Sequence, residues 1–122
     1  MLYDMQLDME LGKYLDCFDG VTFWIWKSTE LPNMEKHVEK LLSVIGDKPL
    51  MLGMYLFDYG TGGIPMNPEL FENQLRLYFN YLRQGKTEGI IFCSGTVGDA
   101  ELETNRILKK YIAQYGETEL EN

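Results

Sequence analysis

The chain has 122 residues, which suits one domain with a buried core. Its composition, 45% hydrophobic and 25% charged residues, is that of a globular protein and excludes a disordered or low-complexity chain. A formal net charge of −8 disfavours nucleic-acid phosphates and anionic membrane surfaces, so we expect neither partner.

Hydrophobic periodicity and turn signals divide the chain into four units, each an apolar strand followed by a helix. In the first unit we expect a strand over Leu2 to Leu7 and a short helix from about Met9. The inward face of that helix is predicted to carry Leu11, Tyr14, Leu15 and Phe18. The second unit has the strand "VTFWIW" (21–26), the loop "KSTELP" and an amphipathic helix from near Asn33 to Gly46.

The third strand, "PLMLGMYLF" (49–57), is almost wholly apolar, as expected for a parallel strand covered on both faces. Its helix has clear start signals, with Asn67 as N-cap and Pro68 at the first helical position, and it ends at Gly85. The fourth strand is "EGIIFCSG" (88–95). The last helix is predicted to be capped by Asp99 and to end at Gly116.

Four alternating strands and helices predict an α/β fold of four consecutive βα units with parallel strands. We assign residues 1–116 to one domain and 117–122 to an acidic tail. Two architectures fit this pattern: a self-sufficient doubly wound sheet, or half of a TIM (β/α)8 barrel, which needs about 250 residues when complete. A half barrel would expose strand edges and an aromatic interior, so it must associate with a missing N-terminal half or with a second copy.

The stretches "DGVTFWIWKSTEL", "LMLGMYLFDYG" and "LFENQLRLYFNYLRQGKTEGIIFCSG" and the final helix resemble the C-terminal half of uncharacterised (β/α)8-barrel proteins related in fold to glycoside hydrolases. The resemblance covers about Leu2 to Gly116 and implies that these strands are the fifth to eighth of a barrel. In many retaining glycosidases of this architecture, catalytic carboxylates follow the fourth and seventh strands. On that mapping Asp58 follows the seventh strand, where Glu is usual, and the other acid lies outside this chain.

Three acids are candidates for catalysis. Asp58 stands at the carboxyl end of the most apolar strand, where rigid neighbours can fix its direction; it can equally serve as an acid that binds backbone donors in the turn after it. Glycoside cleavage needs a second carboxyl group. Asp8 and Glu10 are the candidates, and the alternative is that they cap and start the first helix.

Aromatic residues at strand ends are candidates for carbohydrate binding. Trp24 and Trp26 lie on one face of the second strand because alternate residues point the same way. We expect Trp24 to be buried and Trp26, beside Lys27, to contact a ligand. Tyr55 and Tyr59 could frame the same pocket, although tyrosine often lies at such boundaries without a ligand.

Other chemistries have little support in the sequence. Cys17 and Cys93 form no CxxC motif, the single histidine, His37, is expected to be solvated, and "GTGG" (60–63) matches no phosphate-binding pattern. A Mg²⁺ site of Asp8, Glu10 and Asp58 is not favoured by any ligand spacing, so we expect no metal and no cofactor.

Two functions therefore remain open. The first is a glycoside-hydrolase-like half barrel that acts on or binds carbohydrate. The second is a non-catalytic α/β module that pairs with a copy of itself or with a partner. Nothing in the sequence indicates a localisation.

Overall fold

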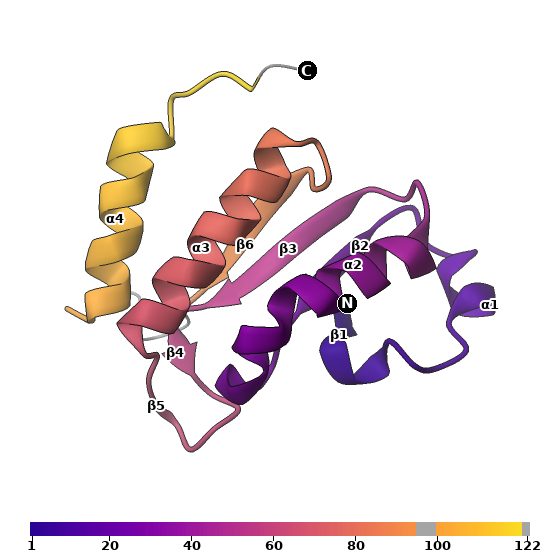
Figure 1. Ribbon diagram of the computed structural model, residues 1–122, viewed down its shortest axis with the longest axis horizontal. Helices are drawn as coiled ribbons and strands as arrows, with labels where there is room; N and C mark the ends of the chain where they lie inside the picture. Colours follow the sequence, from indigo (N-terminus) through magenta and orange to yellow (C-terminus); the bar gives the residue numbers. More distant parts are fainter. Residues whose placement is uncertain (95–99, 121–122) are drawn as a thin grey trace.

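The computed structural model describes residues 1–94 and 100–120, which form an α/β fold around a four-stranded parallel sheet (Figure 1). The strands of this sheet are Leu2–Tyr3 (β1), Val21–Trp24 (β2), Leu50–Tyr55 (β3) and Gly89–Cys93 (β6). The helices are Gly12–Leu15 (α1), Met34–Ile45 (α2), Pro68–Arg83 (α3) and Glu103–Tyr115 (α4). The predicted fold class, α/β with parallel strands, is confirmed.

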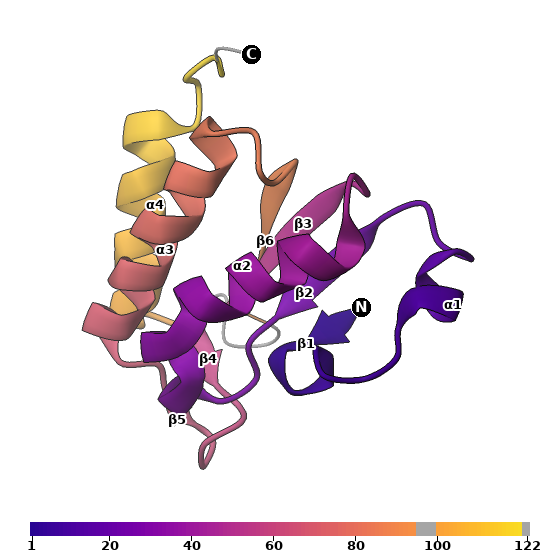
Figure 2. The same ribbon diagram turned by 45° about the vertical axis from the view of Figure 1, so that its right-hand side comes forward.

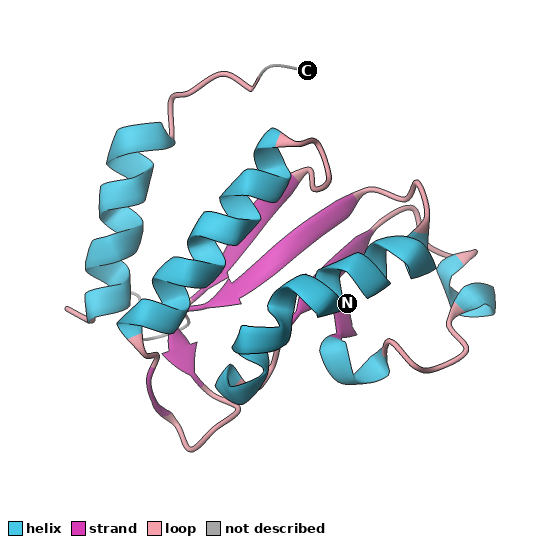
Figure 3. Cartoon of the chain, viewed as in Figure 1, coloured by secondary structure: helices cyan, strands magenta, loops and turns pink. Residues whose placement is uncertain are grey.

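Shorter elements occupy the loops that follow the strands (Figure 3). They are the 3₁₀ helices Asp4–Gln6 (η1) and Ser28–Asn33 (η2), and the antiparallel strands Phe57–Asp58 (β4) and Ile64–Pro65 (β5). The segment Ser28–Asn33 was expected to be an irregular loop, and it instead forms a 3₁₀ helix that leads directly into α2.

The four strands lie side by side in chain order, β1-β2-β3-β6, and every neighbouring pair is parallel. One row across the sheet joins Leu2 to Phe23, Phe23 to Leu52 and Leu52 to Ile90. A doubly wound sheet reverses its strand order at a switch point, and this sheet has no reversal. Right-handed connections between sequential parallel strands place the connecting helices on one face, and buried residues of α2 and α3 join one core cluster with the strands.

The core lies between that face and the helices. Figure 2 shows α2 in front of the strands, with α3 and α4 side by side next to them. Phe23, Leu52 and Met54 from the strands are fully buried, as are Leu41 of α2 and Phe71 of α3. The alternate strand residues, which include Trp24, Tyr55 and Cys93, point to the opposite face. Among the described residues, no helix adds core side chains to that face. It is covered mainly by the side chains of the strands themselves.

The start of α3 follows its sequence signals. The Asn67 side chain accepts hydrogen bonds from the backbone N–H groups of Glu69 (2.9 Å) and Leu70 (3.2 Å), and Pro68 occupies the first helical position. The helix ends before Gly85, whose φ of 71° is a left-handed conformation that favours glycine. The predicted boundaries of this helix are confirmed.

The first unit is the least well predicted. The strand ends at Tyr3, because η1 turns the chain immediately afterwards, and α1 is a single turn of four residues. One turn cannot present a four-residue inward stripe. Leu11 and Leu15 are buried, whereas the prediction that Tyr14 and Phe18 point inward is wrong, since they are 57% and 61% exposed.

The third strand is also shorter than predicted. It ends at Tyr55, and the chain then forms the β4–β5 hairpin, with Gly62 (φ 97°) and Gly63 (φ 65°) in its turn. The predicted cap at Asp99 lies outside the described residues. Within the part of the acidic tail that the structure describes, residues 117–120 are exposed.

The outer strands β1 and β6 each pair with one neighbour, so the sheet is open over the described ranges. Strand β6 is half-buried along its whole length, as expected for an edge. In the described part of the chain, no helix has the length and apolar character that a membrane crossing requires.

Candidate functional site

Polar and aromatic side chains gather where the parallel strands end. Asp4 directly follows β1, Trp26 lies two residues beyond β2, and Asp58 lies three residues beyond β3. These positions share the carboxyl-terminal edge of one parallel sheet, which is the edge where α/β folds place their binding sites. The hairpin turn reaches back across this edge, because the backbone of Gly60 lies directly against the carbonyl group of Trp26.

Five aromatic rings form a continuous chain of contacts at this edge, which we call the aromatic cluster: Tyr3, Trp24, Trp26, Tyr55 and Tyr59. The Trp26 ring meets Tyr3 at 6.2 Å and 83° and Tyr55 at 5.6 Å and 85°, both edge-on. Tyr55 also contacts Trp24 (5.0 Å) and Tyr59 (5.7 Å). Such contacts stabilise each pair by about 0.5–1.5 kcal/mol beyond burial, so the rings hold one another in place.

The two tryptophans differ in exposure as expected. Trp24 is 6% exposed, and its indole lies flat on Gly53, where an added Cβ atom would stand 2.2 Å from the ring. Trp26 is half-buried, and its indole is supported on two sides by Tyr3 and Tyr55. Trp24 is therefore part of the support, and Trp26 has surface left for a ligand.

The tyrosines of the cluster are not equally accessible. Tyr55 is half-buried, and its pKa is raised well above the ordinary value of 10.0, chiefly because burial disfavours the phenolate and also because of its neighbour Tyr3. Tyr59 is exposed, and its hydroxyl donates a hydrogen bond to the backbone carbonyl of Ser94 (3.0 Å). This bond ties the hairpin to the end of β6.

Asp58 is buried, 4% exposed, and its hydrogen bonds lie within the turn that follows it. Its Oδ1 accepts a hydrogen bond from the backbone N–H of Thr61 (3.0 Å), and its carbonyl accepts one from Gly63 (3.1 Å). This is the arrangement of the turn-forming alternative considered from the sequence. It fixes the carboxylate rigidly and leaves one carboxylate oxygen without a hydrogen bond in the described residues.

The other predicted acids and Lys27 have different surroundings. Asp8 is exposed and pairs with Lys40 on α2, on the side of the sheet that carries the helices. Glu10 is exposed, and α1 begins at Gly12 with Leu11 as its N-cap, so neither acid caps that helix. Lys27 is exposed beside Trp26. No described contact brings Asp8 or Glu10 to Asp58.

A group of three side chains that the sequence did not single out as a site lies at the same edge. His37 Nε2 is 2.9 Å from Glu30 Oε2, and the Asp4 carboxylate joins them, with the nearest ligand atoms of all three within 4.8 Å of one another. The contact with His37 is the main reason that the pKa of Glu30 lies below its ordinary value of 4.5. The expectation that His37 is solvated is wrong, because it is half-buried and bonded to Glu30.

Asp4 was missed because it lay inside the strand expected over residues 2–7. Once β1 ends at Tyr3, Asp4 becomes the strand-end acid of the first unit, and its Oδ1 accepts a hydrogen bond from the Trp26 backbone N–H (3.3 Å). A sequence signal was present only in the spacing of Glu30 and His37, two turns apart along η2 and α2.

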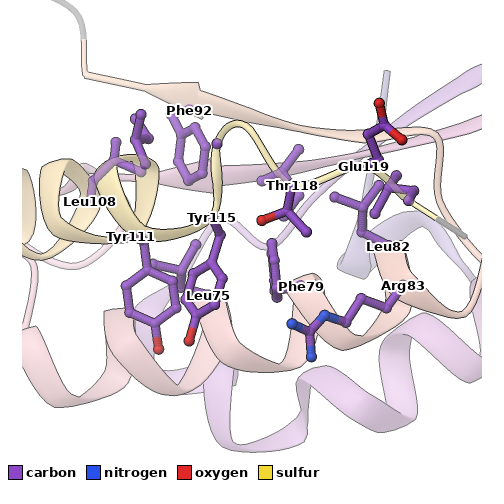
Figure 4. Close-up of a pocket in the computed structure, with 14 residues that line it drawn as sticks. Leu75, Phe79, Leu82, Arg83, Phe92, Leu108, Tyr111, Tyr115, Thr118 and Glu119 are labelled. Atoms are coloured by element: carbon purple, nitrogen blue, oxygen red, sulfur yellow. The ribbon is translucent and has the colours of Figure 1, made fainter.

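A hollow lies between α3, α4, β6 and residues 116–120, with a volume of about 680 Å³ (Figure 4). Its walls are mainly apolar and aromatic, and they include Leu75, Phe92 and Leu108. The Arg83 guanidinium lies over the rings of Phe79 (4.8 Å) and Tyr115 (5.8 Å) at this groove. The groove exists because α4 rests on α3 and leaves part of β6 uncovered.

Comparisons of the chain with protein-family models, curated proteins and solved structures found no match. The function of the site is therefore inferred from its own geometry.

Proposed function

We propose that the chain forms one arc of a (β/α)8-type barrel and binds carbohydrate on the aromatic cluster at its strand ends. The sequential parallel order of β1, β2, β3 and β6, with the core helices on one face, is the order that successive strands of such a barrel have. In a barrel the opposite face of the sheet lines the interior, which is the face that carries Trp24 and Tyr55.

The observation that carries the proposal is the placement of Trp26. A sugar ring presents C–H groups on its faces, which pack well on a flat aromatic surface. The Trp26 indole is partly exposed at the carboxyl-terminal edge, and its edge-on contacts with Tyr3 and Tyr55 hold it before any ligand arrives. A platform that is already ordered loses little conformational entropy on binding.

The geometry supports binding more directly than cleavage. Hydrolysis needs two carboxyl groups about 5–5.5 Å apart for retention or about 6.5–9.5 Å apart for inversion. Asp58 is one rigid carboxylate, but Asp8 is paired with Lys40 and Glu10 has no contact at this edge in the described residues. A glycoside-hydrolase activity would take its second acid from elsewhere in an assembled barrel.

The test is isothermal titration calorimetry with a panel of soluble oligosaccharides. We expect at least one to bind, and Trp26→Ala to weaken it by about tenfold, or about 1.4 kcal/mol. Tyr14→Ala is the matched control, because Tyr14 is an exposed aromatic residue on α1 and should leave the affinity unchanged. Equal affinity of the parent and Trp26→Ala, or no binding across the panel, would contradict the proposal.

A second candidate function, assembly with another copy or with a complementary half barrel, is favoured by the open edges of the sheet. Among the described residues, strands β1 and β6 each present an unpaired side, and β6 is only half-buried. Light scattering after size-exclusion chromatography tests it. We expect a dimer that Ile91→Lys on the open face of β6 disrupts, whereas a monomer at all concentrations would remove this candidate.

A further inference from the structure

We infer that Asp4, Glu30 and His37 form a binding site for a divalent transition-metal ion, with Zn²⁺ as the best-suited probe. The three side chains come from η1, η2 and the first turn of α2, and they converge at the carboxyl-terminal edge of β1 and β2. This inference does not depend on carbohydrate binding.

The separations suit coordination after small side-chain rotations. Zinc bonds to nitrogen and carboxylate oxygen of about 2.0–2.2 Å place two tetrahedral ligands about 3.4 Å apart. The contact between His37 Nε2 and Glu30 Oε2 is already 2.9 Å, and the third ligand atom lies within 4.8 Å of both. A shift of about 1–1.5 Å in one carboxylate would close the set, leaving a fourth position for water or substrate.

The charges at the group are balanced only in part by the protein. Two carboxylates face one imidazole. In the described residues neither Asp4 nor Glu30 forms an ion pair with a lysine or arginine, although the charge of Lys27 helps to lower the pKa of Glu30. Some surface acids elsewhere have such partners, as Asp8 has Lys40 and Glu39 has Lys86. A divalent cation would neutralise the two carboxylates, which no lysine or arginine contacts directly in the described residues.

The orientation of one ligand is already fixed. The Trp26 backbone N–H donates to Asp4 Oδ1 (3.3 Å), which leaves the other carboxylate oxygen free to coordinate.

The nature of the ligands selects the metal class. An imidazole with two carboxylates suits Zn²⁺, Mn²⁺ or Fe²⁺, whereas Mg²⁺ and Ca²⁺ prefer oxygen ligands alone. Among the metals that imidazole suits, zinc binds more tightly than manganese or ferrous iron in the general order of affinities. We therefore expect Zn²⁺ to bind and Mg²⁺ at the same concentration to compete weakly.

The experiment uses the Cys17→Ser chain, because an exposed thiol could bind zinc by itself. Calorimetry with Zn²⁺ should give one equivalent bound, and Asp4→Asn, Glu30→Gln and His37→Gln should each weaken binding at least about tenfold. Asp4→Asn keeps the oxygen that accepts from Trp26, so the local fold is retained. Glu35→Gln, which changes an exposed acid on the same helix, is the matched control and should bind as the parent does.

A measurement on the unmutated ligands removes any dependence on variant folding. His37 is the only histidine, so its imidazole nitrogen resonances are unique in the spectrum. They should move on addition of one equivalent of Zn²⁺ and not on addition of the same amount of Mg²⁺. Unmoved His37 resonances at saturating Zn²⁺, or equal zinc affinity in the parent and all three ligand variants, would overturn the inference.

Discussion

The contact between Trp24 and Gly53 offers a sharp test of how the aromatic cluster is supported. In Gly53→Ala the new Cβ atom would lie 2.2–2.4 Å from three atoms of the Trp24 ring. Carbon atoms in favourable contact are about 3.5–4.0 Å apart, so the indole must move by more than about 1 Å. Because β3 is central in the sheet, the backbone cannot easily yield instead.

The expected cost follows from these contacts. Overpacking of this kind costs about 1–3 kcal/mol. Displacement of Trp24 also weakens its contact with Tyr55, and this loss adds about 0.5–1.5 kcal/mol to the cost. Replacing glycine by alanine restricts the unfolded chain and returns about 0.5–1 kcal/mol. We therefore expect the free energy of unfolding to fall by about 1–3 kcal/mol.

Urea denaturation of Gly53→Ala, Trp24→Ala and the double variant measures this cost and its origin. If the clash with the indole is the cause, Gly53→Ala should cost almost nothing once Trp24 is alanine, giving a coupling of at least about 1 kcal/mol. Gly12→Ala is the control, because a Cβ there meets nothing within 4 Å. An unchanged midpoint for Gly53→Ala, or full additivity in the double variant, would refute the placement of the ring.

Three further predictions concern stability. Asn67→Ala should lower the free energy of unfolding by about 1 kcal/mol in urea titrations, because it removes the cap of α3, and a loss below about 0.3 kcal/mol would contradict the role of the cap. Asp58→Ala should lower the free energy of unfolding by about 1–2 kcal/mol, because it leaves the Thr61 N–H without its acceptor. Asp58→Asn keeps an acceptor oxygen and should lower it by less. Equal losses in the two variants would show that the turn does not depend on the hydrogen bond to Oδ1. Burial raises the pKa of Tyr78 above its ordinary value of 10.0, so the stability that its neutral hydroxyl contributes is complete below pH 10 and is lost as the pH rises further. In Tyr78→Phe the free energy of unfolding should therefore fall less steeply above pH 10, by up to about 1.4 kcal/mol per pH unit. An identical slope in the parent and the variant would count against the burial of Tyr78.

The parts of the fold that the sequence predicts well are those in which local and tertiary forces agree. The start of α3 combines an N-cap, a proline at the first position and an apolar stripe, and all three signals refer to the same few residues. Strand β3 is apolar along its whole length, so the sequence favours a strand whichever of its two faces is buried. Strand order is different, because it depends on long-range pairing that no local pattern encodes.

The parts that were predicted wrongly lie where the hydrophobic pattern fits both the two-residue period of a strand and the period of a helix. "LYDMQL" alternates well enough for a strand, yet the chain leaves the sheet after Tyr3 and forms η1. Because of that one difference, Asp4 lies at a strand end and not inside a strand, so its proximity to Glu30 and His37 was not predicted. The exposure of Trp24 and Trp26 was predicted correctly, since both lie on one face and Trp26 is nearer to the carboxyl-terminal edge.

The central claim is that Trp26 is the carbohydrate platform and Trp24 its buried support. The chain has two tryptophans, so the indole N–H resonances of a ¹⁵N-labelled sample report on each of them during an oligosaccharide titration. We predict a saturable shift of the Trp26 indole that is clearly larger than that of Trp24. Spectra in which both indoles stay still at every concentration, or in which only Trp24 moves, would contradict the claim.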